Sequence, residues 1–158
     1  MPQLVKGGKY IFGWVRIQPD GRIRIPDEAF HEYGFRRGKK IILMSGSKTS
    51  GGFSIMKPEN LSTSNMGQKI TDVIRSLHSR SSFPTERTTI VYAGNRLISQ
   101  AVVDHEMKVA VSAELLQRLG LKTGEKLLVG RGSGLGPAFI ARGRIHAEAL
   151  KHGHISHF

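Results

Sequence analysis

Cysteine is absent from the 158-residue sequence, which excludes disulfide bonds and thiol chemistry. Long apolar runs are absent too. No stretch approaches the roughly 18 consecutive apolar residues of a membrane-spanning helix, and the first residues lack the apolar run of a signal peptide. We therefore expect a cytoplasmic protein without a membrane partner.

Acidic residues are scarce relative to basic ones. The chain has 24 Lys and Arg against 12 Asp and Glu, a net charge of +12. The acids are scattered over predicted turns and helix starts, without paired carboxylates, a Ser-His-Asp set or a metal-binding helix. We therefore expect no enzyme, no cofactor and no metal site. A basic protein with a field of this size favours polyanionic partners, nucleic acid first.

What the sequence does contain is an internal repeat. Residues 21–53 align without a gap with residues 107–139, an offset of 86 positions. Glycines and apolar residues stay in register, and the identical pairs are Glu28/Glu114, Gly34/Gly120, Gly38/Gly124, Lys40/Lys126, Gly46/Gly132, Ser47/Ser133 and Phe53/Phe139. We interpret this as two copies of one supersecondary unit. One copy is too small to bury a core alone, so two copies are expected to pack together, within one chain or between chains.

Each copy begins with a predicted β-hairpin. Apolar and polar residues alternate over 15–17 and 23–25, on either side of the turn 18–21 with its Pro and Gly. Pro26 then ends the ladder.

A short helix and two strands complete the copy. Asp27 and Glu28 suit a helix N-terminus, and Gly34 suits the position that ends a helix. The second copy has Ser112 as N-cap and Gly120 as helix end. Strands are predicted over 40–44, over 126–130 and at the two aligned phenylalanines.

These motifs resemble the AbrB/MazE/SpoVT swapped-hairpin domain. Over residues 14–56 the chain shares the family's Gly-Arg (Gly21-Arg22), alternating apolar residues, Ile-Pro, helix, and Gly-hydrophobic before a strand. Residues 98–142 are similar in spacing, but have Met107-Lys108 for Gly-Arg and Ser112 for proline. The tandem arrangement is similar in layout to MraZ, with Gln18 at that relative's signature aspartate.

The expected fold is mainly β: two swapped-hairpin units forming a β-barrel, with short helices and one central amphipathic helix. The predicted divisions are a first AbrB-like unit at 10–57, a connector at 58–94, a second unit at 95–145 and a His-containing tail at 146–158. Within the connector, apolar residues at helical spacing predict the central helix over 66–79, and "TTIVYAG" (88–94) predicts an extra strand.

The resemblance implies a DNA-binding transcriptional regulator that forms a dimer and binds double-stranded DNA. Some family members are antitoxins, so a protein-interaction module without DNA binding of its own is the alternative. RNA binding is a weaker third possibility, because the copies lack the aromatic signature of common RNA modules. The family's basic helix positions fall on Phe30 and His31, and on Leu116 and Gln117, so those basic contacts are missing.

The candidate DNA-binding residues are basic side chains on the hairpins and on one turn. Arg22 and Arg24, two positions apart on a strand, should leave the same face, and Arg16 on the neighbouring strand could join them. "RRGKK" (36–40) supplies further phosphate contacts in this interpretation; otherwise it is a solvated turn. The full set is Arg16, Arg22, Arg24, Arg36, Arg37, Lys39, Lys40 and Lys108.

Two other motifs are interpreted as structural. The glycine-rich stretch 130–137 lacks a P-loop ending and is expected to be a flexible hairpin loop. His152, His154 and His157 could bind a metal, but no carboxylate or cysteine completes a set nearby, and a mobile tail is expected instead.

Overall fold

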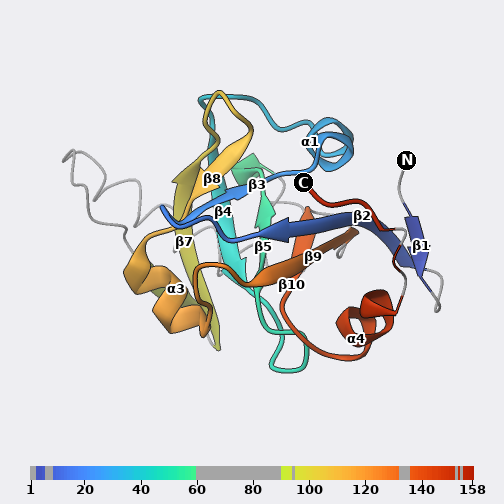
Figure 1. The fold of residues 1–158 in the computed structure, drawn as a ribbon. Helices are drawn as coiled ribbons and strands as arrows, with labels where there is room; N and C mark the ends of the chain where they lie inside the picture. The colour runs from blue at the N-terminus through green and yellow to red at the C-terminus, as the bar shows by residue number, and fades with distance from the viewer. Residues whose placement is uncertain are drawn as a thin grey trace, which may run out of the picture.

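A computed structural model describes residues 3–5, 9–59, 90–93, 95–131, 136–151, 153 and 155–158. Over these residues the protein is mainly β, as predicted (Figure 1). The strands are β1 (Gln3–Val5), β2 (Lys9–Arg16), β3 (Arg22–Arg24), β4 (Lys40–Ser45), β5 (Phe53–Met56), β6 (Ile90–Ala93), β7 (Arg96–Val102), β8 (Lys108–Ala110), β9 (Lys126–Arg131) and β10 (Pro137–Ile140). The helices are α1 (Asp27–Glu32), α3 (Ala113–Leu119) and α4 (Arg144–Leu150). Among the described helices, none combines the length and the apolar character needed to cross a membrane.

The strands form two antiparallel sheets. The larger has eight strands in the order β1-β2-β9-β10-β5-β4-β7-β6, and the smaller is the pair β3-β8. Within the described ranges the strands close no barrel, since the large sheet ends at the edges β1 and β6. The prediction of a barrel is therefore not confirmed.

The predicted local hairpin is wrong in its pairing. The turn 18–21 is present, and the Gly21 N–H donates to the Gln18 carbonyl at 2.8 Å. Beyond the turn the two strands separate: β2 pairs with β1 and β9, whereas β3 pairs with β8. Alternation of apolar residues fixes which face of a strand is buried, but it does not identify the strand that supplies the hydrogen bonds.

The pairings obey a pseudo-two-fold symmetry at the 86-residue offset. Arg16 pairs with Lys126, and the equivalent pair Lys40 and Val102 joins β4 to β7. Two residue pairs lie on the symmetry axis: Ile23 faces Val109, and Phe53 faces Phe139 with the rings stacked at 4.8 Å. The long strand that opens each copy therefore pairs with the strand after the helix of the other copy, and the order of the large sheet reads the same from either end.

The two short helices match the sequence prediction. α1 starts after Pro26 with Asp27 and Glu28 in its first turn, and it ends just before Gly34. α3 is capped by Ser112, whose Oγ accepts the Leu115 N–H at 3.1 Å. Strands β4, β5, β9 and β10 also lie where they were predicted, and β6 is the expected extra strand. The central helix over 66–79 lies outside the described residues.

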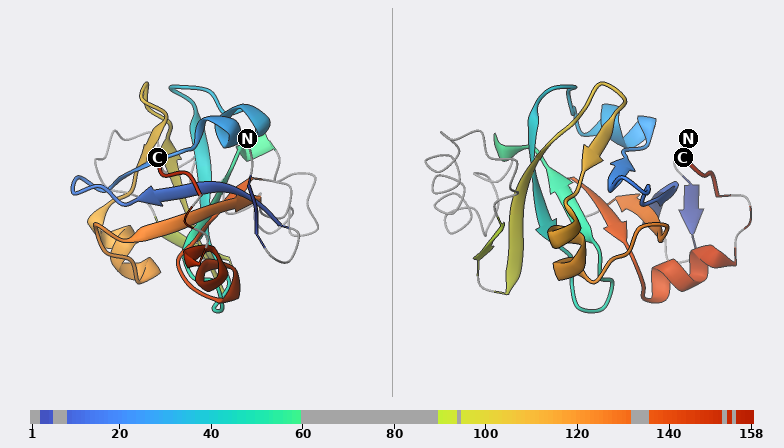
Figure 2. Two further views of the ribbon diagram at one scale, coloured as in Figure 1. Left: turned by 45° about the vertical axis from the view of Figure 1, so that its right-hand side comes forward. Right: turned by 60° about the vertical axis from the view of Figure 1, so that its left-hand side comes forward.

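The core occupies both faces of the large sheet. The main cluster lies between this sheet, the β3-β8 pair and helices α1 and α3, and includes Ile17, Ile23, Leu127 and Phe139. On the opposite face, Trp14 and Leu128 are covered by Ala149 of α4 and by Ile155. Figure 2 shows α4 at the β1 side of the sheet, away from β6.

The C-terminal residues were expected to form a mobile tail, and this prediction is wrong for the described part. α4 was not foreseen. After it, the Trp14 N–H donates to the Ser156 carbonyl and the Phe158 N–H donates to the Trp14 carbonyl, both at 2.8 Å. Burial of Ile155 and these two hydrogen bonds hold residues 155–158 against β2. His152 and His154 lie outside the described residues, as do positions 132–135 of the glycine-rich loop.

Candidate nucleic-acid interface

Arg22 lies at the centre of an ion-pair cluster built from both copies. Its Nε donates to Asp20 of its own turn at 2.7 Å. Its Nη1 reaches the turn of the second copy, where Asp104 lies at 3.4 Å and Glu106 at 3.2 Å. Lys108, which occupies the position equivalent to Arg22, also pairs with Glu106 at 3.2 Å. Two cations therefore meet three carboxylates.

The pKa values of the cluster follow from these contacts. The backbone N–H of Arg22 and then its guanidinium lower the pKa of Asp20. Hydrogen bonds from the side chains of Lys108 and Arg22 lower the pKa of Glu106. Burial opposes ionisation of Asp104, but the backbone N–H groups of Lys108 and Glu106 outweigh it, and the pKa is lowered. Asp20 and Glu106 raise the pKa of Arg22 further. The three carboxylates and Arg22 are therefore charged at neutral pH, and the cluster is not a bare basic face.

Arg24 lies on the same face of β3 as Arg22, because the two flank the buried Ile23. The Arg24 Nη2 donates to Asp27 at 2.8 Å. Its Nε is buried and has no hydrogen-bond partner within the described part of the chain. The side chains of Arg22 and Arg24 are only about one-third exposed, at 32% and 35%, and that of Lys108 is 16% exposed. These three predicted contacts are thus partly shielded.

Arg16 lies apart from that cluster. It is the last residue of β2, and its Nη1 donates to the Gly124 carbonyl at 2.8 Å, on the turn that follows α3. The structure therefore directs Arg16 towards the second copy's turn at 122–125, not towards Arg22 and Arg24.

The turn 36–40 carries a group of exposed cations. Arg36, Arg37, Lys39 and Lys40 are all exposed. Arg37 Nε donates to the His105 carbonyl at 3.0 Å, and the Arg37 guanidinium lies 5.5 Å from the centre of the Phe30 ring. Among described residues, the side chains of the other three have no ion pair or hydrogen bond. The N–H of Gly38 donates to the Val103 carbonyl at 2.7 Å, which fixes the turn to the second copy.

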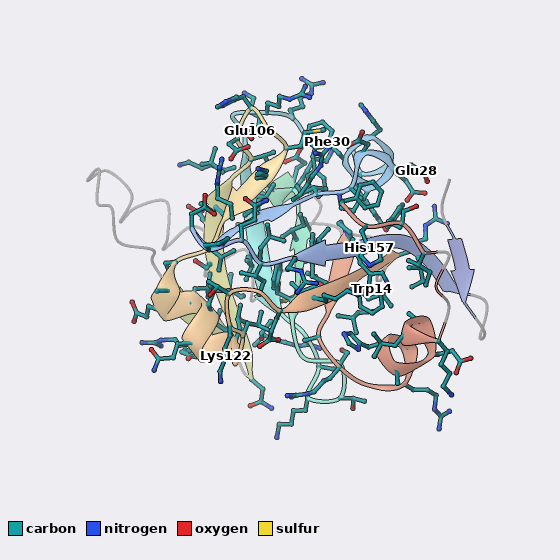
Figure 3. The ribbon with its side chains drawn as sticks, in the orientation of Figure 1. Trp14, Glu28, Phe30, Glu106, Lys122 and His157 are labelled. Carbon is teal, nitrogen blue, oxygen red and sulfur yellow. The ribbon has the colours of Figure 1, made fainter. Side chains whose placement is uncertain are left out.

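The equivalent turn of the second copy has fewer free charges. The Glu125 carboxylate accepts the N–H of Lys122 at 3.0 Å, and Lys126 Nζ lies over the Trp14 ring at 4.8 Å. Figure 3 shows the two turns far apart: Glu106 and Phe30 mark the end of the molecule near turn 36–40, and Lys122 lies towards the other end.

A pocket opens beside turn 36–40. Its volume is about 790 Å³, and its lining includes Phe30, Phe35, Arg36, Lys39 and Lys57. The sequence prediction missed Lys57, which follows β5 and is brought to α1 only by the fold. No local pattern marks this lysine as part of a site.

The described side chains offer no group of three or more His, Cys, Asp or Glu residues that could hold a metal ion. His157 is engaged with β2 through a bridge to Trp14.

Comparison of the chain with protein-family models and with curated proteins found no match.

Proposed function

We propose that the protein is a transcriptional regulator that binds double-stranded DNA, and that turn 36–40 makes its main phosphate contacts. The observation that carries the proposal is the exposed turn itself, on which three of four clustered cations have no partner among the described side chains. A net charge of +12 adds a long-range attraction for a polyanion.

The rigidity of the turn supports this assignment. Backbone and side-chain hydrogen bonds tie Gly38 to Val103 and Arg37 to His105. The cations therefore project from a fixed backbone, and binding requires ordering of side chains only. Displacement of counterions from DNA by such cations supplies most of the sequence-independent affinity.

The hairpin arginines take a secondary part in this proposal. Arg22 holds the two hairpin turns together through Asp20, Asp104 and Glu106. The surplus of negative charge around it repels phosphate. Arg24 pairs with Asp27, Lys108 shares Glu106 with Arg22, and Arg16 donates to the Gly124 carbonyl. We therefore assign Arg16, Arg22, Arg24 and Lys108 to the margin of the DNA-binding surface.

We also propose that the chain is a tandem member of the AbrB/MazE/SpoVT swapped-hairpin family. The support is the exchange of strands between copies, in which β2 pairs with β9 and β4 pairs with β7. The dimer and the barrel-like closure that the resemblance implies belong to this proposal, as does the cytoplasmic location expected from the composition.

Fluorescence anisotropy with a labelled duplex of mixed sequence tests the function. We expect binding that weakens steeply with salt. The triple variant Arg36→Ala, Lys39→Ala, Lys40→Ala should reduce the slope of log K against log[salt] by about 3, close to one unit per lost phosphate contact. The matched control is Lys48→Ala, Lys122→Ala, Lys151→Ala, which removes the same charge elsewhere and should leave most of the affinity.

Equal losses in the two triple variants would show that only net charge matters. Absence of duplex binding at low salt would reject the function. Selection of bound fragments from a random duplex pool then measures sequence preference.

The carboxylates that pair with Arg22 and Lys108 favour a second candidate function. This candidate is a protein-interaction module, such as an antitoxin-like or scaffold protein. The apolar residues at the family's basic helix positions, Phe30 and Leu116, are buried in the core and leave no basic helix face. Co-purification of a small acidic protein without nucleic acid would support this candidate over the first.

A further inference from the structure

We propose that the pocket beside α1 binds a small molecule that carries two or more linked phosphate groups. This inference does not rest on DNA binding, because it follows from the pocket's own shape and charge. A volume of about 790 Å³ lies in the range of small-molecule sites. A duplex would meet the exposed turn but could not enter a pocket of this size.

The pocket joins an apolar wall to a cationic rim. Phe30, Phe35 and Ile41 line it and are almost fully buried, so they belong to a packed wall that does not need to form on binding. Arg36, Lys39 and Lys40 contribute exposed cations from the turn. A preformed wall with charges at its edge is the arrangement that binds an anion with an attached organic group.

Lys57 adds a fourth cation to the rim, from the segment after β5. The Lys57 Nζ lies close to Gly34, just after the end of α1. If Gly34 had a Cβ atom, that atom would be 3.2 Å from the Nζ. The Nζ also lies 3.9 Å from the Glu59 carboxylate. Glu59 is the one acidic side chain among the described residues that line the pocket, where Arg36, Lys39, Lys40 and His31 are also found. The pocket therefore keeps an excess of positive charge.

The second copy indicates that part of this charge is not needed for folding. Positions equivalent to Arg36, Lys39, Lys40 and Lys57 are Lys122, Glu125, Lys126 and Gly143. Two of the four cations are thus replaced, by an acid and by a glycine. Of the two that remain, Lys126 packs over Trp14. The two turns have the same backbone conformation at their glycines, with φ +80° at Gly38 and +88° at Gly124. The extra cation of the first turn, Lys39, therefore serves something other than the fold of the turn. Lys57 differs from this case, because its counterpart Gly143 has a left-handed φ of +99°.

The charge pattern selects the ligand class. Four cations approach from two elements, the turn after α1 and the segment after β5. A diphosphate or triphosphate chain presents more charged oxygens to these arginine and lysine donors than a single carboxylate or phosphate does. Pyrophosphate and ATP share this chemistry, and adenosine lacks it.

Isothermal titration calorimetry of the full chain with sodium pyrophosphate, ATP and adenosine tests the proposal. We expect one site per chain for pyrophosphate and ATP, and no binding of adenosine. Lys57→Ala should weaken pyrophosphate binding about tenfold or more, as expected for the loss of a charge-assisted contact. The matched control is Lys151→Ala, because Lys151 also lies 3.9 Å from a carboxylate, that of Glu148, but outside the pocket. This control should change the affinity less than about twofold.

Stronger binding of ATP than of pyrophosphate would show that the organic part also contacts the pocket, in support of the proposal. Equal weakening by Lys57→Ala and Lys151→Ala, several equivalent sites per chain, or no heat with either phosphate would overturn it. Lys57 is not among the proposed DNA contacts, so duplex affinity of Lys57→Ala should stay unchanged. The failure of one proposal is therefore distinguishable from the failure of the other.

Discussion

Arg22 illustrates, at the scale of single residues, how distant parts of a sequence decide what a side chain does. The Gly-Arg motif and the alternation of apolar residues indicated its place on a polar face. They did not indicate its partners, because Asp104 and Glu106 lie 82 and 84 positions away. An arginine that is free on the surface and one that is paired with carboxylates have the same local sequence pattern.

The Arg22 cluster predicts how stability depends on pH. The folded state lowers the pKa of Asp20, Asp104 and Glu106. These carboxylates therefore stabilise the folded state at pH values above the ordinary pKa of an Asp or Glu side chain. That contribution is lost as the pH falls through the lowered values. We expect urea midpoints to decrease from pH 5 towards pH 2, and Arg22→Ala should make this decrease shallower.

The control for this measurement is Arg118→Ala. Arg118 pairs with Glu114 on the exposed face of α3, at 3.0 Å, and is not part of the cluster. Its removal should leave the acid dependence as in the parent protein. The cluster has no role in acid stability if Arg22→Ala and the parent lose stability in parallel.

At the scale of elements, the turn 18–21 of the first copy predicts how much stability two glycine substitutions remove. Gly21 has φ +82°, and a Cβ there would lie 2.5 Å from the Val111 carbonyl oxygen on the other copy. Gly38 has a similar φ of +80°, but a Cβ would meet no described atom within 4 Å. Gly38→Ala should cost about 1–2 kcal/mol for the left-handed backbone alone. Gly21→Ala should cost about 3 kcal/mol or more, because the backbone contact adds to this penalty.

Chemical denaturation of the two variants measures this difference in the free energy of unfolding. The comparison requires that both variants have the same slope of free energy against denaturant concentration. The pair is a test of the contact between copies, since both substitutions impose the same backbone strain. Equal losses of stability would mean that the first turn does not press against Val111.

Most elements could be predicted, because the information for them is local. Apolar runs after the turns at Gly38 and Gly124 placed β4 and β9, and helix-start residues and the glycines after the helices placed α1 and α3. The pairing of β2 with β9 could not be predicted, since strands of either copy present the same apolar face. α4 was missed because a run of histidines near the end of the sequence suggested a solvated tail, whereas Ala149 and Ile155 in fact cover Trp14.

At the scale of the whole molecule, the candidate site was predictable only in part. The exposure of turn 36–40 follows from its sequence, since four cations around a glycine cannot be buried together. The pocket could not be predicted, because its rim joins residues from α1, the turn and the segment after β5. Such a combination exists only once the sheet order is known.

The pseudo-two-fold symmetry predicts how the proposed dimer should come apart. Strand exchange is complete within one chain, so a dimer must form through another surface. Dilution should then give folded monomers of 17.4 kDa, with an unchanged far-ultraviolet circular dichroism spectrum. Light scattering and circular dichroism over a dilution series check this. Simultaneous loss of mass and of secondary structure would instead indicate that strands are exchanged between chains.

The exchange of strands also determines when the protein can fold. Residues of β2 obtain their β9 partners only from positions 126–130, and β4 waits for 98–102. The mean sequence separation of contacts is therefore high. This slows folding, because the entropy of closing long loops is lost before the strand pairing that stabilises the sheet has formed. On the ribosome, the first copy emerges with strand edges that have no partner until the second copy follows. During that interval the nascent chain is most exposed to aggregation and most dependent on chaperones.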